Sequence, residues 1–181
     1  MKAGHPRAKM LAKNVAKGRT TMINTLRRID RKLSDEDAMT VLRESEYGFL
    51  STINEDGTPH CVPLAFALYN GALYFHCARA GQKLDNLRRD NRAQFTCVRN
   101  SRTVPMQFTI EFASCMVDGL IHFVEDEQER MDAMRAICEK YDPEGLDTPS
   151  YERIMRGMPA VVMLRMEITA LCGKANRGKL G

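Results

Sequence analysis

The chain has 181 residues, of which 44% are hydrophobic and 28% charged, an ordinary composition for a globular protein with one sizeable core. No window approaches 18 consecutive apolar residues, which excludes a membrane-spanning helix, and the basic N-terminus lacks the apolar stretch of a secretory signal. The six cysteines show neither C-x-x-C pairs nor zinc-ligand spacing, and we expect them to be reduced. These features predict a cytoplasmic protein.

The net charge of +4 conceals an uneven distribution. Residues 1–32 contain ten Lys or Arg and a single acidic residue, Asp30. A basic arm of this kind can contact nucleic acid or an anionic membrane. However, residues 1–21 have few large apolar side chains and cannot bury much surface. We therefore expect residues 1–25 to form a poorly ordered leader and residues 26–181 a single domain, without binding to nucleic acid or membrane.

A short helix and three strands are predicted at the start of the domain. Ser34 lies three residues before Asp37, a capping pattern that begins a helix. Two hairpin signals follow, Asp-Gly at 56–57 and Asn-Gly at 70–71, whose residues tolerate positive φ. Pro63 lacks a backbone donor and should lie at a sheet edge or a bulge. Three apolar runs around these turns predict consecutive antiparallel strands at 49–53, 61–69 and 72–77.

The rest of the chain continues as a mixture of strands and helices. The apolar spacing predicts helices at 81–89 and 125–141, a helical turn at 151–157, and strands at 93–98, 106–117, 120–124 and 160–169. Asp118 and Gly119 are predicted to form the turn between two of these strands. The fold class is therefore mainly β: an antiparallel barrel of six or seven strands with peripheral helices.

One segment could bind an anion where a strand ends and a helix begins. Arg79 and Lys83 are four residues apart, so their side chains can converge near the first helical turn. Backbone N–H groups and the positive end of the helix dipole favour an anion there, and Gly81 allows close approach. Two cations at a helix N-terminus suit a phosphate monoester. Spacing alone leaves a solvated cationic helix face as the alternative.

Other motifs with chemical meaning are absent. The four histidines are scattered, with no H-E-x-x-H pattern, and no metal site is expected. The sequence also has no G-x-G-x-x-G fingerprint and no G-x-S-x-G elbow. A dinucleotide-binding Rossmann site and an α/β-hydrolase nucleophile are therefore not predicted.

Several short motifs occur in an order that resembles a known superfamily. They are Arg-Arg-Ile-Asp-Arg at 27–31, Gly-Phe-Leu-Ser-Thr at 48–52, Asp-Gly-Thr-Pro at 56–59, Val-Pro-Leu at 62–64, Gly-Ala-Leu-Tyr-Phe-His-Cys-Ala-Arg at 71–79 and Gly-Gln-Lys-Leu at 81–84. Together they resemble the pyridoxamine 5'-phosphate oxidase-like, FMN-binding split barrels, and within these the nitroimidazole-resistance (Nim-type) flavoproteins. The resemblance implies a split-barrel homodimer with FMN in each of two clefts between subunits.

The resemblance also implies a set of site residues. Cofactor-binding positions would be Cys61, Val62, Pro63, Leu64, His76, Cys77, Arg79, Gln82, Lys83 and Ser114. The segment 61–64 would lie along the flavin ring, mainly through its backbone, while Arg79 and Lys83 would hold the phosphate with Gln82 nearby. His76 matches a position beside the flavin and is the catalytic candidate, although a strand-end histidine satisfied by hydrogen bonding is the alternative. Ser114 matches a position that faces the cofactor of the partner subunit.

The resulting functional hypothesis is an FMN-dependent oxidoreductase that reduces a small acceptor, such as a nitroaromatic compound. His76 would be the proton donor. The alternatives are a non-catalytic flavin-binding protein and a haem-binding protein, since related split barrels bind haem. The arginine-rich phosphate motif of true pyridoxamine 5'-phosphate oxidases is not evident, so vitamin B6 oxidation is not predicted.

Overall fold

The structure, a computed structural model, describes residues 26–176, and the predicted leader lies outside the described residues. Its strands are β1 (Tyr47–Ile53), β2 (Pro59–Ala65), β3 (Ala67–Tyr69), β4 (Ala72–Ala78), β5 (Arg92–Val104), β6 (Thr109–Phe123) and β7 (Val161–Asn176). Its α-helices are α2 (Asp35–Glu44), α3 (Gln82–Arg89), α4 (Glu127–Tyr141) and α5 (Pro149–Arg156), and its 3-10 turns are η1 (Ile29–Arg31), η2 (Pro105–Gln107), η3 (Pro143–Gly145) and η4 (Met158–Ala160). None of the helices in this part of the chain is long and apolar enough to cross a membrane.

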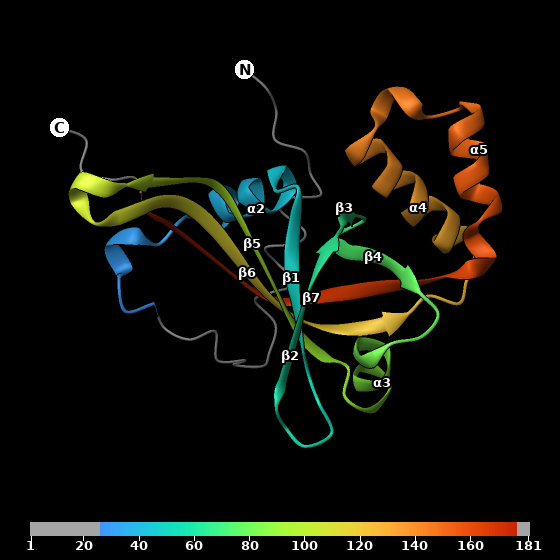
Figure 1. Ribbon diagram of the computed structural model, residues 1–181, viewed down its shortest axis with the longest axis horizontal. Coiled ribbons are helices and arrows are strands. Elements are labelled where there is room, and N and C mark those ends of the chain that lie inside the picture. The colour runs from blue at the N-terminus through green and yellow to red at the C-terminus, as the bar shows by residue number, and fades with distance from the viewer. Residues whose placement is uncertain (1–25, 177–181) are drawn as a thin grey trace.

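The seven strands form one antiparallel sheet in the order β2-β1-β5-β6-β7-β4-β3. Figure 1 shows that this sheet is strongly curved, and its two sides approach each other because β2 contacts β4. Alternate side chains of the strands point to the inside and form the main core. Its fully buried members include Leu50, Phe75, Phe95, Val117 and Leu164. The predicted split barrel is therefore confirmed.

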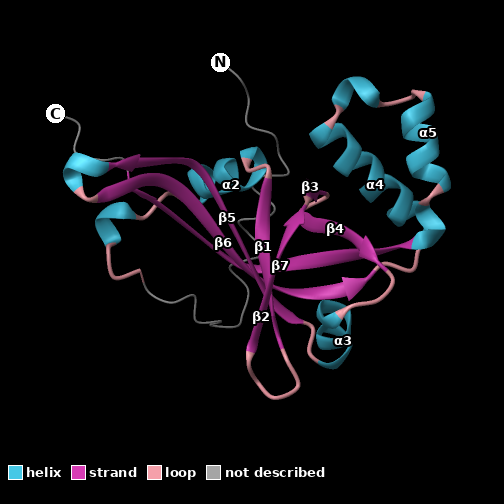
Figure 2. Ribbon diagram, viewed as in Figure 1, coloured by secondary structure: helices cyan, strands magenta, loops and turns pink. Residues whose placement is uncertain are grey.

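Helices cover one end and one side of the barrel (Figure 2). Ser34 caps α2 as predicted, since its Oγ accepts a hydrogen bond from the Asp37 backbone N–H at 3.0 Å. The helix packs Ala38 against Gly173 of β7. A side chain at position 173 would not fit, because its Cβ atom would lie 2.5 Å from that of Ala38. On the outer side of β4, the helix α4 packs Met134 against the sheet in a second, smaller apolar cluster that also includes residues from η4 and β7.

The predicted strand over residues 61–69 is interrupted at Phe66. Residues before it form β2, which pairs with β1, whereas residues after it form β3, which pairs with β4. The interruption has a physical cause: Phe66 is fully buried, and its backbone N–H donates to the Tyr141 Oη at 3.0 Å instead of to a strand. The three-stranded meander is therefore wrong, since β4 pairs with β7. The edge position predicted for Pro63 is confirmed.

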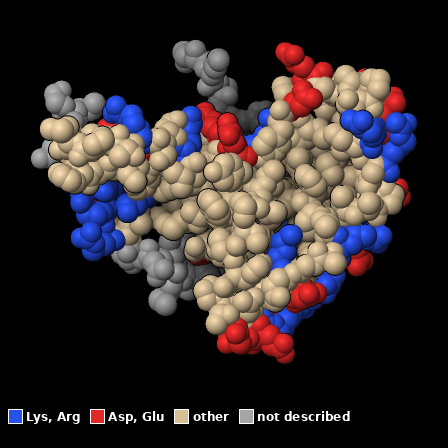
Figure 3. All heavy atoms as spheres, in the orientation of Figure 1, with Lys and Arg blue, Asp and Glu red and all other residues tan. Residues whose placement is uncertain are grey.

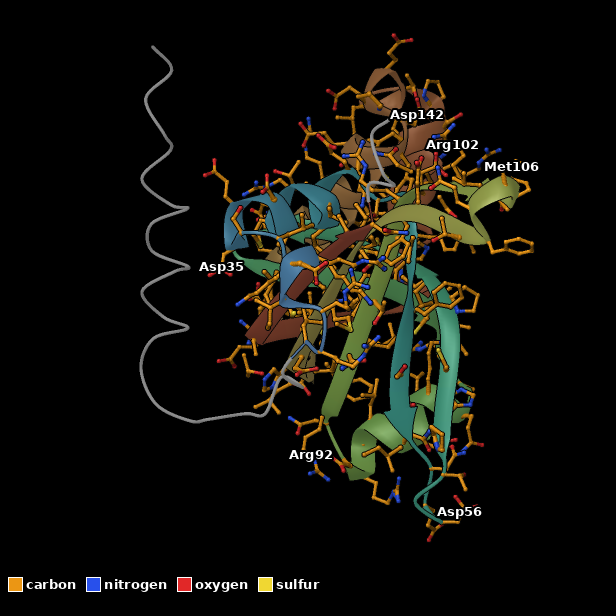
Figure 4. The ribbon with its side chains drawn as sticks, turned by 90° about the vertical axis from the view of Figure 1, so that its left-hand side faces the viewer. Asp35, Asp56, Arg92, Arg102, Met106 and Asp142 are labelled. Carbon is orange, nitrogen blue, oxygen red and sulfur yellow. The ribbon has the colours of Figure 1, made fainter. Side chains whose placement is uncertain are left out.

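The hairpin predicted to turn at Asp118 and Gly119 is also wrong. These two residues lie inside the long strand β6, at a β-bulge where the register with β7 shifts. The actual turn is η2, at the outer end of a long β5–β6 arm whose tip carries Met106 (Figure 4). The Asn-Gly and Asp-Gly turns at 70–71 and 56–57 are confirmed, with positive φ at Asn70 and at both glycines.

Candidate cofactor-binding site

The predicted anion site lies at the junction between β4 and α3. The helix begins after Gly81, whose φ of 139° is a conformation that residues with a side chain rarely adopt. Gly81 provides no side-chain cap, whereas Ser34, Asp126 and Thr148 cap the N-termini of α2, α4 and α5. The first N–H groups of a helix have no partner within it. At α3 these donors therefore remain available to an anion.

Arg79 and Lys83 flank this helix N-terminus, and neither forms an ion pair within residues 26–176. Arg79 is exposed, while Lys83 is half-buried and close enough to Cys77 to oppose the burial that raises the pKa of that thiol. The two predicted phosphate-binding cations thus lie on either side of Gly81, within the same strand-to-helix junction.

The basic residues farther along α3 already have partners. Arg88 forms an ion pair with Asp85 at 2.9 Å, and the Arg89 guanidinium donates a hydrogen bond to the Ile53 carbonyl. These contacts neutralise one cation and direct the other towards the β1–β2 turn. Of the basic residues at this junction and on α3, Arg79 and Lys83 are therefore the ones with neither an ion pair nor a side-chain hydrogen bond to another described residue.

The segment Cys61–Leu64 lies in β2 at the edge of the sheet. Val62 and Leu64 pack against the main core, whereas Cys61 and Pro63 point outwards and are exposed. One side of β2 pairs with β1, and no strand of the described sheet pairs with its other side. Because β2 contacts β4, this segment lies near the strand that ends at the junction. Free backbone groups on an edge strand can bind a planar ligand or a second chain.

His76 and Cys77 are neighbours in β4, so their side chains lie on opposite faces of the sheet. His76 lies opposite Met163 of β7 and is more than half buried, and its Nδ1 has no hydrogen-bond partner within residues 26–176. Burial lowers the pKa of His76 below its usual value of 6.5. The ring is therefore mostly neutral at pH 7. Cys77 faces the main core and is buried.

Ser114 is not near the junction in this chain. It lies on β6 opposite Lys174, and its Oγ donates a hydrogen bond to the Lys174 carbonyl at 3.2 Å. Residues 120–123, at the far end of β6, pair with the residues of β7 that in turn pair with β4. Ser114 lies six to nine residues before them, or about 20–30 Å along an extended strand. A shared site would need Ser114 from another copy.

One residue that anchors this region, Asn86, is not among the predicted site residues. It is buried on α3 and connects the helix to β1 and to the β1–β2 turn through hydrogen bonds to Thr52 and Asn54, respectively. The available signal was its spacing from Gln82, four residues earlier on the same helix, with which it forms a further hydrogen bond. A polar residue on the buried face of a short helix requires such partners.

A separate groove of about 920 Å³ lies at the other end of the molecule, beside η1 and the tip of the β5–β6 arm. It is lined by residues of both charges, and its Arg28 and Asp30 form an ion pair with each other. None of the predicted site residues lines it. The site at the β4–α3 junction is therefore distinct from this groove.

The curved antiparallel sheet, with α2 packed against it and the uncapped helix α3 following β4, defines the split-barrel class. Residues 34–175 match the family model described as pyridoxamine 5'-phosphate oxidase, and the chain belongs to this family. No curated protein matches the sequence at a significant level.

Solved structures with the same fold include several cofactor-binding proteins. One is described as a putative 5-nitroimidazole antibiotic resistance protein from Bacteroides thetaiotaomicron, with 22% identity, a TM-score of 0.69, and coverage of 80% of this chain and 86% of that one. An FAD-binding protein from Mesorhizobium loti has 21% identity, a TM-score of 0.61, and coverage of 81% and 97%. An FAD- and haem-binding protein from Mycobacterium smegmatis has 15% identity, a TM-score of 0.67, and coverage of 82% and 74%. At these identities the likeness shows the fold alone.

Proposed function

We propose that this protein binds FMN at the β4–α3 junction and acts as an oxidoreductase that reduces a small acceptor, such as a nitroaromatic compound. The observation that carries the proposal is the uncapped N-terminus of α3 beside Arg79 and Lys83. Helix N–H groups and two cations without anionic partners in the described residues form a chemically suitable site for a dianionic phosphate. Membership of the family and the flavin-binding proteins among similar structures support the choice of a flavin.

The remaining parts of a flavin would extend from this phosphate site towards β2. Every second residue of that strand directs its N–H and C=O to the free edge, so within 61–64 the available backbone groups belong either to Cys61 and Pro63 or to Val62 and Leu64, and Pro63 offers only its carbonyl. Backbone bonds of this kind hold a ring in place without requiring a particular side chain. Bound FMN supplies hydride or single-electron transfer, and the protein determines its position and which molecules reach it.

His76 is the candidate for moving a proton in this reaction. In the structure its ring is mostly neutral at pH 7, because burial lowers its pKa. A neutral imidazole accepts a proton readily, but it donates one only after a nearby negative charge has raised its pKa. We therefore expect His76 to contribute when such a charge forms beside it. Replacing His76 with Gln should lower the turnover number by a larger factor than the affinity for FMN, which a kinetic assay and a flavin titration of the same variant would measure.

The visible spectrum of the purified protein, recorded alone and after addition of FMN, tests the proposal. Bound flavin gives bands near the ultraviolet–visible boundary whose shape changes on binding, and their loss on addition of a nicotinamide donor would indicate catalytic reduction. Bands that persist with every donor would favour a non-catalytic flavin-binding protein. A protein that neither retains FMN nor binds added FMN would contradict the proposal.

Haem is a second candidate, which one observation favours. His76 keeps a neutral ring with an Nδ1 that has no partner within residues 26–176, and neutral imidazole is a common ligand of haem iron. A similar structure is that of a protein that binds both FAD and haem. The same spectrum separates the two cofactors, because bound haem gives an intense Soret band that flavin lacks.

We further propose that the active form is a homodimer. The outer face of β1 and β5 exposes several large apolar side chains, among them Tyr47, Phe49, Ile53 and Val98. Figure 3 shows a broad area without charges over the middle of the molecule in this view. The tip of the β5–β6 arm adds Met106 and Phe108, which are almost fully exposed. Apolar surface of this extent is typical of an interface.

The dimer proposal predicts the effect of a charge at Phe49. This side chain is 42% exposed on β1, between Pro63 of β2 and Thr96 of β5. Phe49→Asp should change the mass in light scattering from twice the chain's 20.5 kDa to the single-chain value, because a buried carboxylate opposes association. Ile154→Asp on α5, at 43% exposure, is the matched control and should remain dimeric. A wild type that is monomeric at micromolar concentration would contradict the proposal.

A further inference from the structure

A one-directional series of hydrogen bonds links the N-terminus of α3 to the tip of the β1–β2 turn. Gln82, the first residue of α3, donates from Nε2 to the Asn86 Oδ1 at 3.1 Å. Asn86 in turn donates from Nδ2 to the Asn54 Oδ1 at 2.8 Å, and Asn54 donates from Nδ2 to the Thr58 Oγ1 at 3.0 Å. The Thr58 hydroxyl then donates to the Asp56 carboxylate at 2.6 Å.

The carboxylate at the end fixes the direction of the whole series. Two hydrogen bonds from Thr58 lower the pKa of Asp56, so this group is ionised at neutral pH and can only accept. Thr58 must therefore direct its hydroxyl hydrogen to Asp56 and accept from Asn54. The side-chain amides of Asn54 and Asn86 are oriented in the same direction, each donating from its NH2 group and accepting at its oxygen. Gln82 therefore donates one N–H of its amide to Asn86, and its second N–H takes no part in the series.

Asn86 is the central member of this series. Its side chain is buried, with 2% of the residue exposed, and all of its hydrogen-bonding groups are engaged because Nδ2 also donates to the Thr52 Oγ1 at 3.1 Å. It thereby fixes both the distance of α3 from β1 and the orientation of the Gln82 amide. Figure 4 shows α3 beside the turn that carries Asp56, at the opposite end of the barrel from Met106.

We propose that Asn86 is a positioning residue for phosphate recognition: acting through Gln82, it holds an amide donor and the first turn of α3 in place for the phosphate of FMN. This inference rests on the proposed function. It explains why a polar residue occupies the buried face of α3 between Leu84 and Leu87, where an apolar residue would pack without needing partners. Asn86 does not itself contact the ligand, so its effect should be specific for the phosphate group.

The test compares the affinities for FMN and riboflavin, which differ only in the phosphate, by titration of flavin fluorescence. Asn86→Ala should reduce the preference for FMN over riboflavin by about tenfold, the size expected for one hydrogen bond to a charged group, with riboflavin affinity unchanged. Because Asn86 acts through Gln82, it should have little further effect on that preference in a Gln82→Ala background. Ser45→Ala, which removes another buried hydrogen bond at the other end of the barrel, should leave the preference intact.

A second variant covers the case in which Asn86→Ala does not fold. Thr58→Val, at an exposed position, removes the acceptor used by Asn54 and should reduce the preference in the same direction by about threefold, as for a weakened neutral hydrogen bond. An unchanged preference in the variants, or equal weakening of both flavins, would overturn the positioning role. A wild type without any preference for FMN would instead overturn the proposed phosphate site, which separates the two failures.

Discussion

Replacing Arg79 and Lys83 together with Ala should weaken FMN binding by roughly 1,000-fold, because each cation is expected to contribute about thirtyfold through a charged hydrogen bond. Neither side chain has an anionic partner in the described residues, so their removal leaves no unpaired carboxylate behind. Thermal stability should therefore change little. Titration of FMN and riboflavin measures the effect, and only the FMN affinity should fall.

The matched control for this pair is Arg88→Ala. It removes the same charge from the same helix, but Arg88 already pairs with Asp85 and lies over the ring of Phe123, at the C-terminal end of α3. Its loss should reduce FMN affinity by less than about threefold, as expected for a screened surface charge. If the Arg88 variant loses as much affinity as the Arg79 and Lys83 variants, the site responds to overall charge and the phosphate lies elsewhere.

Local signals in the sequence were sufficient to predict much of the site region. The Asn-Gly turn at 70–71, the cap at Ser34 and the helix after Gly81 each depend on residues within a few positions of one another. Such elements are determined by backbone conformation and short-range hydrogen bonds. The Arg79 and Lys83 pair was predictable for the same reason, since their spacing on the chain places both beside one helical turn.

Features that depend on distant residues could not be predicted in this way. The break at Phe66 results from Tyr141, 75 residues later, whose hydroxyl accepts from the Phe66 N–H and lies 3.2 Å from its carbonyl. Nothing near Phe66 indicates that contact. Asn86 is similar, because its partners Thr52 and Asn54 lie more than 30 residues before it. The two cations of the candidate site were thus visible in the sequence, whereas the hydrogen bonds that anchor α3 appear only in three dimensions.

The same distinction leads to a large predicted effect at Gly119. The sequence pattern predicts a hairpin turn there, and in an exposed turn a change to Ala costs about 1 kcal/mol. In the structure Gly119 is buried inside β6 at the bulge, and a Cβ atom would overlap the Glu167 carbonyl oxygen of β7 and lie 2.9 Å from the Met166 side chain. The backbones of β6 and β7, which are paired central strands of the sheet, cannot move apart without a large cost in free energy. Gly119→Ala should therefore lower the free energy of unfolding by about 3 kcal/mol or more.

Urea unfolding of two glycine variants separates the turn from the bulge. Gly57→Ala is the control, since Gly57 has a φ of 82° in the exposed β1–β2 turn and a Cβ there meets no atom within 4 Å. Its cost should be limited to backbone strain, about 1 kcal/mol. Equal losses in the two variants would mean that Gly119 behaves as a turn residue. A much larger loss at Gly119 would show that β6 crosses the barrel without a break, and this continuity places the β5–β6 arm and Ser114 far from the β4–α3 junction.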